Sequence, residues 1–229
     1  MTRLLVVTAA TAERDAVVAG RMPATSVVEG FTVRRCITPA GLMDAVAGGV
    51  GPVASAVTTC RALRAGYDLV VSAGIAGGFP AVAVGGVAVA DAVVHADLGA
   101  QTAEGFSSMA ELGWGPVRFD LDRDLAAEFG RRTHAIRGAV LTVSTVTGSL
   151  SGAEMLRRTH PDAVAEAMEG IGAYHAAIGQ GVAFAEIRTI SNPVGPRHRD
   201  EWRVTEALTA LTTAFDALLA APLGLALAP

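Results

Sequence analysis

The sequence predicts an α/β protein, a single domain of three layers (α/β/α) in which helices cover both faces of a central mixed, mostly parallel sheet. Short apolar runs such as Leu4–Thr8 and Asp68–Ala73 are typical of strands buried on both faces. Segments of helical character alternate with these strands, as they do in α/β folds. No repeat or linker interrupts the 229 residues, so the predicted domain covers residues 1–229.

In the first half of the chain, strands are expected where apolar residues run together and turns where glycines cluster. The expected elements are the strand Leu4–Thr8, a helix or turn at Ala12–Ala19, the strand pair Thr32–Ile37 and Gly41–Ala47, the helix Val53–Ala65, and the strands Asp68–Ala73 and Val87–Val94. Glycine turns are expected at Gly48–Gly51 and Gly74–Gly78. The polar, glycine-punctuated segment Asp97–Trp114 predicts an irregular loop.

The second half continues the alternation. The expected elements are the helix Asp122–Arg131, the strand Gly138–Ser144, the short helix Ala153–Arg158, the short strand Ala165–Met168, the helix Ile171–Gly179, the strand Val182–Ile190 and the helix Trp202–Ala220. Leu208, Leu211 and Phe215 recur at helical spacing in the last of these, which predicts an amphipathic closing helix.

The amino-acid composition argues against several classes of protein. The net charge of −4 offers no broad basic surface for nucleic acid. No apolar run approaches the roughly 20 residues of a membrane helix, and no signal peptide is expected at the start. Cys36 and Cys60 are isolated in apolar runs, without metal-ligand spacing, which favours reduced thiols in a cytoplasmic protein. We therefore expect neither a metal nor a cofactor.

Ligands of open α/β sheets bind beyond the carboxyl ends of the strands, so polar residues at these ends are candidates for a binding site. Glu13 follows the first strand, and Gly74–Gly78 follows a central one. Met168 and Glu169 lie at a strand–helix junction, and the last strand ends at Arg188–Asn192. These segments are the candidate site.

Two glycine-rich turns have competing interpretations. Residues 49–54 fit the dinucleotide-binding pattern G-x-G-x-x-A, but the next strand does not end in the acid that such a site needs, so a tight packing turn is favoured. Gly74–Gly78 could present backbone N–H groups to a ligand oxygen, or it could be a structural turn. It contains no serine, which excludes a nucleophile elbow.

Two charged residues are open to a functional and a structural interpretation. Glu169 could accept hydrogen bonds from two neighbouring sugar hydroxyls, or it could be an acid stabilised by the helix N-terminus. Arg188 and Asn192 lie four apart on a strand and hence on the same side. Arg188 could also be a surface charge, although its neighbours are strongly apolar.

Three motifs together resemble the nucleosidase branch of the purine nucleoside phosphorylase superfamily. They are Ala73–Gly78 (AGIAGG), Ala167–Gly170 (AMEG) and Ile187–Asn192 (IRTISN), preceded by Glu13 just after the first strand. The resemblance covers nearly the whole chain and implies a nucleoside phosphorylase-like fold. In addition, DLGA at 97–100 with Gly105 and Phe106, and SNPVGPR at 191–197, resemble the futalosine hydrolase family, which releases hypoxanthine in an alternative menaquinone pathway.

The resemblance implies roles for individual residues. Glu13 would activate water against the anomeric carbon, and Arg188 would sit near that water. Met168 would pack on the sugar, and Glu169 would bind the ribose hydroxyls. Asn192 would contact the purine at N7 and O6.

The sequence departs from the methylthioadenosine nucleosidases at two of these positions. Asn192 replaces an aspartate that protonates adenine, and an amide can donate to N7 or O6 of a 6-oxopurine but cannot act as an acid. Ile75 replaces a serine, so a water contact of that branch would be absent or replaced. Gly74 and Ile75 are still expected to line the substrate site. Phe106 and Arg197 are candidates for binding the carboxylated tail of futalosine.

Water is the expected nucleophile, because the segment before Gly74 lacks the arginines that would hold phosphate. Three alternatives stay open: an inosine or guanosine phosphorylase, a methylthioadenosine-type nucleosidase, and a non-catalytic nucleotide-binding module. The expected partners are a small purine nucleoside and further copies of the chain, in a dimer or larger homo-oligomer, with no nucleic acid and no membrane.

Overall fold

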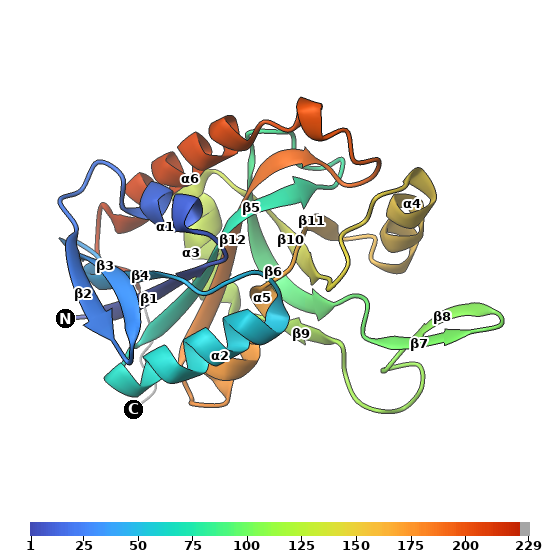
Figure 1. Ribbon diagram of the computed structural model, residues 1–229, viewed down its shortest axis with the longest axis horizontal. Coiled ribbons are helices and arrows are strands. Elements are labelled where there is room, and N and C mark those ends of the chain that lie inside the picture. The colour runs from blue at the N-terminus through green and yellow to red at the C-terminus, as the bar shows by residue number, and fades with distance from the viewer. Residues whose placement is uncertain (225–229) are drawn as a thin grey trace.

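The computed structural model describes residues 1–224; residues 225–229, the end of the predicted domain 1–229, lie outside the described residues. The strands are β1 (Arg3–Thr8), β2 (Ala24–Val28), β3 (Phe31–Thr38), β4 (Gly41–Ala47), β5 (Leu69–Gly78), β6 (Val87–His95), β7 (Gly99–Thr102), β8 (Gly105–Ser108), β9 (Arg118–Asp120), β10 (Ile136–Thr142), β11 (Ala163–Ala167) and β12 (Ala183–Pro193). The helices are α1 (Thr11–Val18), α2 (Pro52–Ala62), α3 (Arg123–Thr133), α4 (Leu150–Thr159), α5 (Gly170–Ile178) and α6 (Val204–Leu219), with 3₁₀ turns at Leu63–Ala65 and Arg199–Glu201. Figure 1 shows their arrangement.

One large mixed sheet forms the centre of the molecule, as predicted, in the order β11-β10-β6-β12-β5-β1-β4-β3-β2, with β9 paired to β6. Parallel pairings join β4, β1, β5 and β12, and again join β6, β10 and β11. The strands β2, β3 and β9 and the β12–β6 contact are antiparallel. Because β1, β4, β5 and β12 are parallel, the carboxyl ends of these four strands lie at one edge of the sheet, and β6, β10 and β11 run in the opposite direction beside β12.

The sheet also curls onto itself, which the sequence does not predict. The far end of β5 pairs antiparallel with β11, so that Ala165 lies opposite Gly78 and Glu166 opposite Gly77. This contact closes the ring β5-β12-β6-β10-β11. Five strands thus surround a small enclosed core, and the end of β5 is held between β11 and β12.

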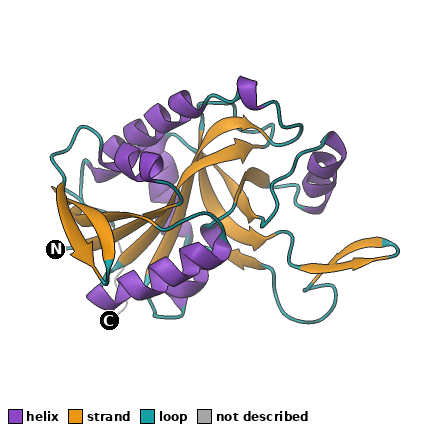
Figure 2. Ribbon diagram, viewed as in Figure 1, coloured by secondary structure: helices purple, strands orange, loops and turns teal. Residues whose placement is uncertain are grey.

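Helices cover the sheet on both faces (Figure 2). On one face α1, α3 and α6 pack on the sheet through buried residues such as Val17, Phe129 and Phe215. On the other face α5 packs through Ile171 and Ala173, and α2 lies against α5. Helix α4 covers the smaller cluster at the β10–β11 edge. Among residues 1–224, no helix has both the length and the apolar character to cross a membrane.

Four sequence expectations are corrected here. Gly74–Gly78 is the end of strand β5 and not a turn. Residues Asp97–Trp114 contain a two-stranded hairpin, β7–β8, and are not wholly irregular. Strands β2 and β9 were not expected. Both are short, and β2 joins β3 through Glu29 and Gly30, which adopt positive φ values of 49° and 86°.

Candidate active site

A cavity of about 160 Å³ lies at the carboxyl ends of β1, β5, β11 and β12, where the parallel-sheet rule places a ligand site. Its wall combines apolar side chains with carboxylates, an amide and one guanidinium. The lining residues are Ala9, Glu13, Ile75, Ala76, Gly77, Val146, Thr147, Glu166, Ala167, Met168, Glu169, Ser191, Asn192, Val194, Gly195, Arg197 and Trp202. Six predicted site residues therefore share one cavity: Glu13, Ile75, Met168, Glu169, Asn192 and Arg197.

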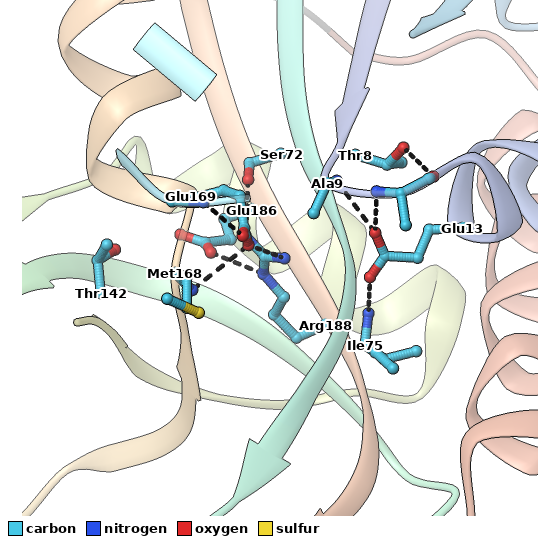
Figure 3. Close-up of polar contacts among 12 residues, drawn as sticks. Thr8, Ala9, Glu13, Ser72, Ile75, Thr142, Met168, Glu169, Glu186 and Arg188 are labelled. Atoms are coloured by element: carbon cyan, nitrogen blue, oxygen red, sulfur yellow. Dashed lines mark hydrogen bonds and ion pairs between the residues drawn. The ribbon is translucent and has the colours of Figure 1, made fainter. Parts of the chain in front are cut away.

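Glu13 is held at the cavity by three backbone N–H groups (Figure 3). Its Oε2 accepts from Ala9 N at 3.0 Å and Ala10 N at 2.9 Å, and its Oε1 accepts from Ile75 N at 2.9 Å. Ala10 is the N-cap of α1, so the same carboxylate also caps that helix. Burial raises the pKa of Glu13, against the opposing effects of these N–H groups and of Arg188. The result is a fixed carboxylate whose affinity for a proton is increased.

Glu169 joins three parts of the chain at the junction between β11 and α5. Its Oε1 accepts from Gly51 N, the N-cap of α2, at 3.2 Å. Its Oε2 accepts from Met168 N at 3.3 Å and from Arg188 Nη1 at 3.2 Å. Glu169 does not cap its own helix α5 with its side chain. The glycine turn before α2 thus serves to bring a backbone donor to a pocket carboxylate.

Arg188 lies beneath the cavity and does not line it. The side chain is 1% exposed, which excludes the surface interpretation. Its Nε donates to Glu186 Oε1 at 2.8 Å and its Nη2 donates to Ser72 Oγ at 2.8 Å, in addition to the Glu169 contact. Arg188 therefore orients Glu169 and lowers the pKa of Glu13 from below, without reaching the cavity.

The charges around Arg188 do not balance. Glu13, Glu169 and Glu186 surround one guanidinium, and Glu186 Oε2 has no hydrogen-bond partner among the described residues. Burial raises the pKa of Glu186, with Arg188 opposing. Gly170 makes room for that carboxylate, because a Cβ there would meet Glu186 Oε2 at 2.1 Å.

Asn192 lies on the cavity wall at the end of β12. Its Oδ1 accepts from Ser191 Oγ at 2.8 Å, and its Nδ2 donates to Pro193 O at 2.9 Å. The second Nδ2 hydrogen and one lone pair of Oδ1 are left for a ligand. A register shift between Ile190 and Asn192 changes the strand pattern here, so counting residues from Arg188 does not give the side on which Asn192 lies.

The cavity also contains polar residues that the sequence analysis missed. Glu166, two positions before Met168, accepts hydrogen bonds from Thr147 N at 2.8 Å and Thr147 Oγ1 at 2.5 Å. Trp202 lies under Arg197, whose guanidinium carbon is 5.4 Å from the ring centroid. The alternation of Glu166 with Met168 was the available signal for the first of these.

Two predicted substrate-binding residues are placed elsewhere. Gly74 lies behind Glu13 and does not line the cavity; a Cβ at Gly74 would come within 2.5 Å of Glu13 Oε1 and 3.1 Å of Arg188 Nη1. Phe106 lies on the β7–β8 hairpin, which projects from the body of the protein (Figure 1), and it does not line this cavity. The role predicted for Phe106 in binding the 5′ side of the substrate stays a prediction.

Among residues 1–224, no group of three or more His, Cys, Asp or Glu side chains is arranged to hold a metal ion. The site instead offers the carboxylate of Glu13, two further carboxylates, an amide and an apolar wall. Such a set can bind a polar sugar and a flat heterocycle and can deliver a water molecule to them.

The curled mixed sheet, its helices and the carboxylate-lined cavity at the strand ends define the nucleoside phosphorylase/nucleosidase fold. A solved methylthioadenosine/S-adenosylhomocysteine nucleosidase from Neisseria meningitidis, in complex with methylthio-immucillin-A, matches with a TM-score of 0.83 at 20% identity, over 96% of this chain and 99% of that chain. The family model described as "Phosphorylase superfamily" matches residues 6–221, and the chain belongs to this family.

Two relatives are more similar in sequence. Futalosine hydrolase of Streptomyces coelicolor is 50% identical over 94% of this chain and 94% of its own length. Futalosine hydrolase of Acidothermus cellulolyticus is 42% identical over 95% of this chain and 90% of its own length. These similarities confirm the resemblance that the three sequence motifs indicated.

Proposed function

We propose that this protein is an N-glycosidic bond hydrolase that cleaves futalosine and releases hypoxanthine, in the futalosine pathway of menaquinone biosynthesis. The observation that carries the proposal is the convergence of Glu13, Glu169 and Asn192, far apart in sequence, on one small cavity. The 50% identity to a futalosine hydrolase over nearly the full length supports this substrate class.

The cavity favours water over phosphate as the nucleophile. Among the described residues, Arg197 is the one arginine in the cavity wall, and it stacks on Trp202. Arg188 is already bound by Glu186, Glu169 and Ser72. A phosphate dianion would lack the cations that usually hold it and would face Glu13 and Glu169 at close range.

The proposed reaction passes through an oxocarbenium-like state. Glu169 accepts hydrogen bonds from the ribose hydroxyls, and Met168 packs on the sugar. Glu13 takes a proton from water as the water oxygen bonds to C1′. The C1′–N9 bond breaks, its electron pair moves onto the purine, and Asn192 donates a hydrogen bond to N7 or O6. The purine anion takes a proton from solvent to give hypoxanthine, and Glu13 returns its proton to solvent. Arg188 positions Glu169, and Ile75 forms part of the wall.

The 5′ side of the substrate carries a carboxylate. We assign it to Arg197, which is exposed at the rim of the cavity. The Trp202 ring fixes the guanidinium there and offers an apolar surface beside it. Phe106 of the same chain does not line the cavity.

We also propose that the protein works as a homo-oligomer in the cytoplasm. Helix α2 exposes Val53 and Val57, which are 75% and 52% accessible, beside Val50 of the preceding turn. Both cysteines, Cys36 and Cys60, are free thiols, which is usual in a reducing compartment. Light scattering coupled to size exclusion tests the oligomer directly; a monomer at micromolar concentration contradicts it.

The test of the reaction is incubation with futalosine, inosine or methylthioadenosine in phosphate-free buffer, with chromatography of the released base. We expect hypoxanthine from futalosine without added phosphate. Strict dependence on phosphate would make the protein a phosphorylase, and preferred release of adenine would make it a methylthioadenosine-type nucleosidase. Bound purine without any release would leave a binding module.

A second measurement tests Asn192. We expect Asn192→Asp to shift preference from hypoxanthine nucleosides toward adenine nucleosides, because a carboxyl group can supply the proton that the amide cannot. An unchanged ratio of kcat/KM for inosine and methylthioadenosine contradicts the assignment of Asn192 to the base.

A further inference from the structure

Glu166 is a cavity carboxylate that the reaction described above does not use. Only 6% of the residue is exposed, and it lies on β11 two positions before Met168. Successive residues of a strand alternate in direction, so Glu166 and Met168 share a face. Thr147 donates to both carboxylate oxygens, through its N at 2.8 Å and its Oγ1 at 2.5 Å. The side chain is therefore fixed and faces the cavity.

The closure of the sheet places Glu166 across from Asn192. Glu166 on β11 and Asn192 on β12 are both in register with Gly77 of β5, which lies between them. Neighbouring strands are about 4.8 Å apart, so the two backbones are separated by roughly 10 Å. A Cβ at Gly77 would meet Val194 Cγ2 at 3.0 Å and Asn192 Nδ2 at 3.6 Å, so these two side chains lie over this position. Glu166, Asn192 and Val194 all line the cavity, and a flat heterocycle bound in it would have a polar side chain on either side and the apolar Val194 on the wall.

The carboxylate of Glu166 can accept more hydrogen bonds than the described residues donate to it. Burial raises its pKa, the two Thr147 hydrogen bonds lower it, and the charge of Asp97 raises it. Within residues 1–224 it forms no ion pair. An ionised carboxylate has about four acceptor positions, and Thr147 occupies two. A ligand N–H at this wall would compensate a buried charge that now has only neutral donors.

We propose that Glu166 is a specificity-determining residue that accepts a hydrogen bond from N1–H of a 6-oxopurine. Asn192, on the other side of Gly77, contacts the O6 and N7 edge of the same base. This inference rests on the proposed function in that it places a purine in the cavity.

Glu166 then distinguishes hypoxanthine from adenine. Hypoxanthine carries a hydrogen on N1, whereas adenine presents a lone pair there. An ionised carboxylate can only accept, so it meets a donor in one base and another acceptor in the other. A site built to hydrogen-bond a ligand group rejects analogues that lack it, because its own buried polar atom is left without a partner.

The test uses binding of the free bases, which does not require turnover. Calorimetric titration compares hypoxanthine with 1-methylhypoxanthine, which has no N1–H, in the wild-type protein and in Glu166→Gln. The glutamine amide can keep both Thr147 contacts, with its oxygen facing Thr147 N and its nitrogen donating to Thr147 Oγ1. Glu154→Gln, on the exposed surface of α4 outside the cavity, is the matched control.

We expect wild type and Glu154→Gln to bind hypoxanthine about 10- to 100-fold more tightly than 1-methylhypoxanthine, the range of a charge-assisted hydrogen bond. We expect Glu166→Gln to lose most of this preference. Equal affinity for the two bases in wild type overturns the proposal without any variant, and so does an unchanged preference in Glu166→Gln.

The binding data and the futalosine assay together separate failure of this inference from failure of the proposed function. If hypoxanthine binding depends on Glu166 but no hypoxanthine is released from futalosine, Glu166 still recognises the base and the proposed hydrolase activity is wrong. Hydrolysis of futalosine with no dependence of base affinity on N1–H would keep the enzyme and overturn the role of Glu166.

Discussion

Two acid–arginine clusters, each with a buried carboxylate, lie on the same sheet and differ in their ratio of carboxylates to guanidinium groups. In the Asp44 cluster, Asp44 accepts from Arg35 Nε and Arg35 Nη2, each at 2.7 Å, and from Tyr67 Oη at 2.7 Å. One carboxylate there meets one guanidinium. In the Arg188 cluster, three carboxylates, Glu13, Glu169 and Glu186, share a single guanidinium.

The ratio of carboxylates to guanidinium groups distinguishes a structural cluster from a cluster at the candidate active site. Every oxygen of Asp44 has a partner within the protein, and the cluster does not line the cavity. In the Arg188 cluster, burial raises the pKa of both Glu13 and Glu186, and one oxygen of Glu186 has no partner among the described atoms. Carboxylates in excess of their cationic partners, with raised pKa values and beside a cavity, are typical of a functional site that binds a proton or a ligand. We therefore expect mutations in the two clusters to affect different quantities.

The largest effect is expected on turnover from Glu13→Gln. Loss of the base should lower kcat by about 100- to 10,000-fold, the usual range for general-base assistance. The fold should remain, because the amide oxygen can still accept from Ala9 N and Ala10 N. Steady-state hydrolysis of futalosine and circular dichroism give the two readouts. Retention of near-wild-type kcat would remove Glu13 from the mechanism.

The next effect is expected on stability from Arg188→Met. Removing one partner of a buried ion pair commonly costs about 3–5 kcal/mol, because the remaining charges lose their compensation. Urea unfolding measures the change. The double variant Arg188→Met with Glu186→Gln should recover part of the loss, since the stranded carboxylate is then neutral. Equal stability of the two variants would show that Glu186 is not held in place by Arg188.

Asp44→Asn should reverse the pattern of Glu13→Gln. The substitution weakens the contacts to Arg35 and Tyr67 in a fully buried place, and about 1–3 kcal/mol of unfolding free energy should be lost. The folded variant should keep its kcat, because the Asp44 cluster has no contact with the cavity. A loss of kcat without a loss of stability would contradict the division between the clusters.

The smallest effect is expected from pH. Glu13 acts as a base only when ionised, and burial places its pKa above the ordinary value of 4.5. The quantity kcat/KM should therefore rise with pH through this raised pKa and fall about tenfold for each pH unit below it. The fold favours the protonated form, so the stabilisation associated with Glu13 is lost over the same range as pH rises. A fall in kcat/KM that begins only below pH 4.5 would contradict a pKa of Glu13 raised by burial.

The elements that the sequence predicted well are those whose apolar runs are long. β1 follows directly from such a run, and the helix α6 follows from apolar residues that recur at helical spacing. β7, β8 and β9 are three or four residues long and partly polar, too short to show a period. The β11–β5 pairing depends on how the sheet curls in space, which no local pattern contains.

The candidate site was predictable where a residue sits directly at a strand end. Glu13, Glu169 and Asn192 do so, and the structure brings them together. Phe106 does not line the cavity, because it lies on the β7–β8 hairpin, whose position the sequence did not predict. Glu166 was missed because its place in the cavity follows from the closure of the sheet and from Thr147, 19 residues earlier in the chain.

The contact between Glu13 and the backbone of β5 requires a glycine at position 74. The backbone of β5 passes between Glu13 and Arg188, and a single added methyl group would meet Glu13 Oε1 at 2.5 Å. The missing side chain lets the Glu13 carboxylate lie against the β5 backbone, where Ile75 N donates to it. A side chain at position 74 would displace this carboxylate, and we therefore expect it to alter the interaction with Arg188 that lowers the pKa of Glu13.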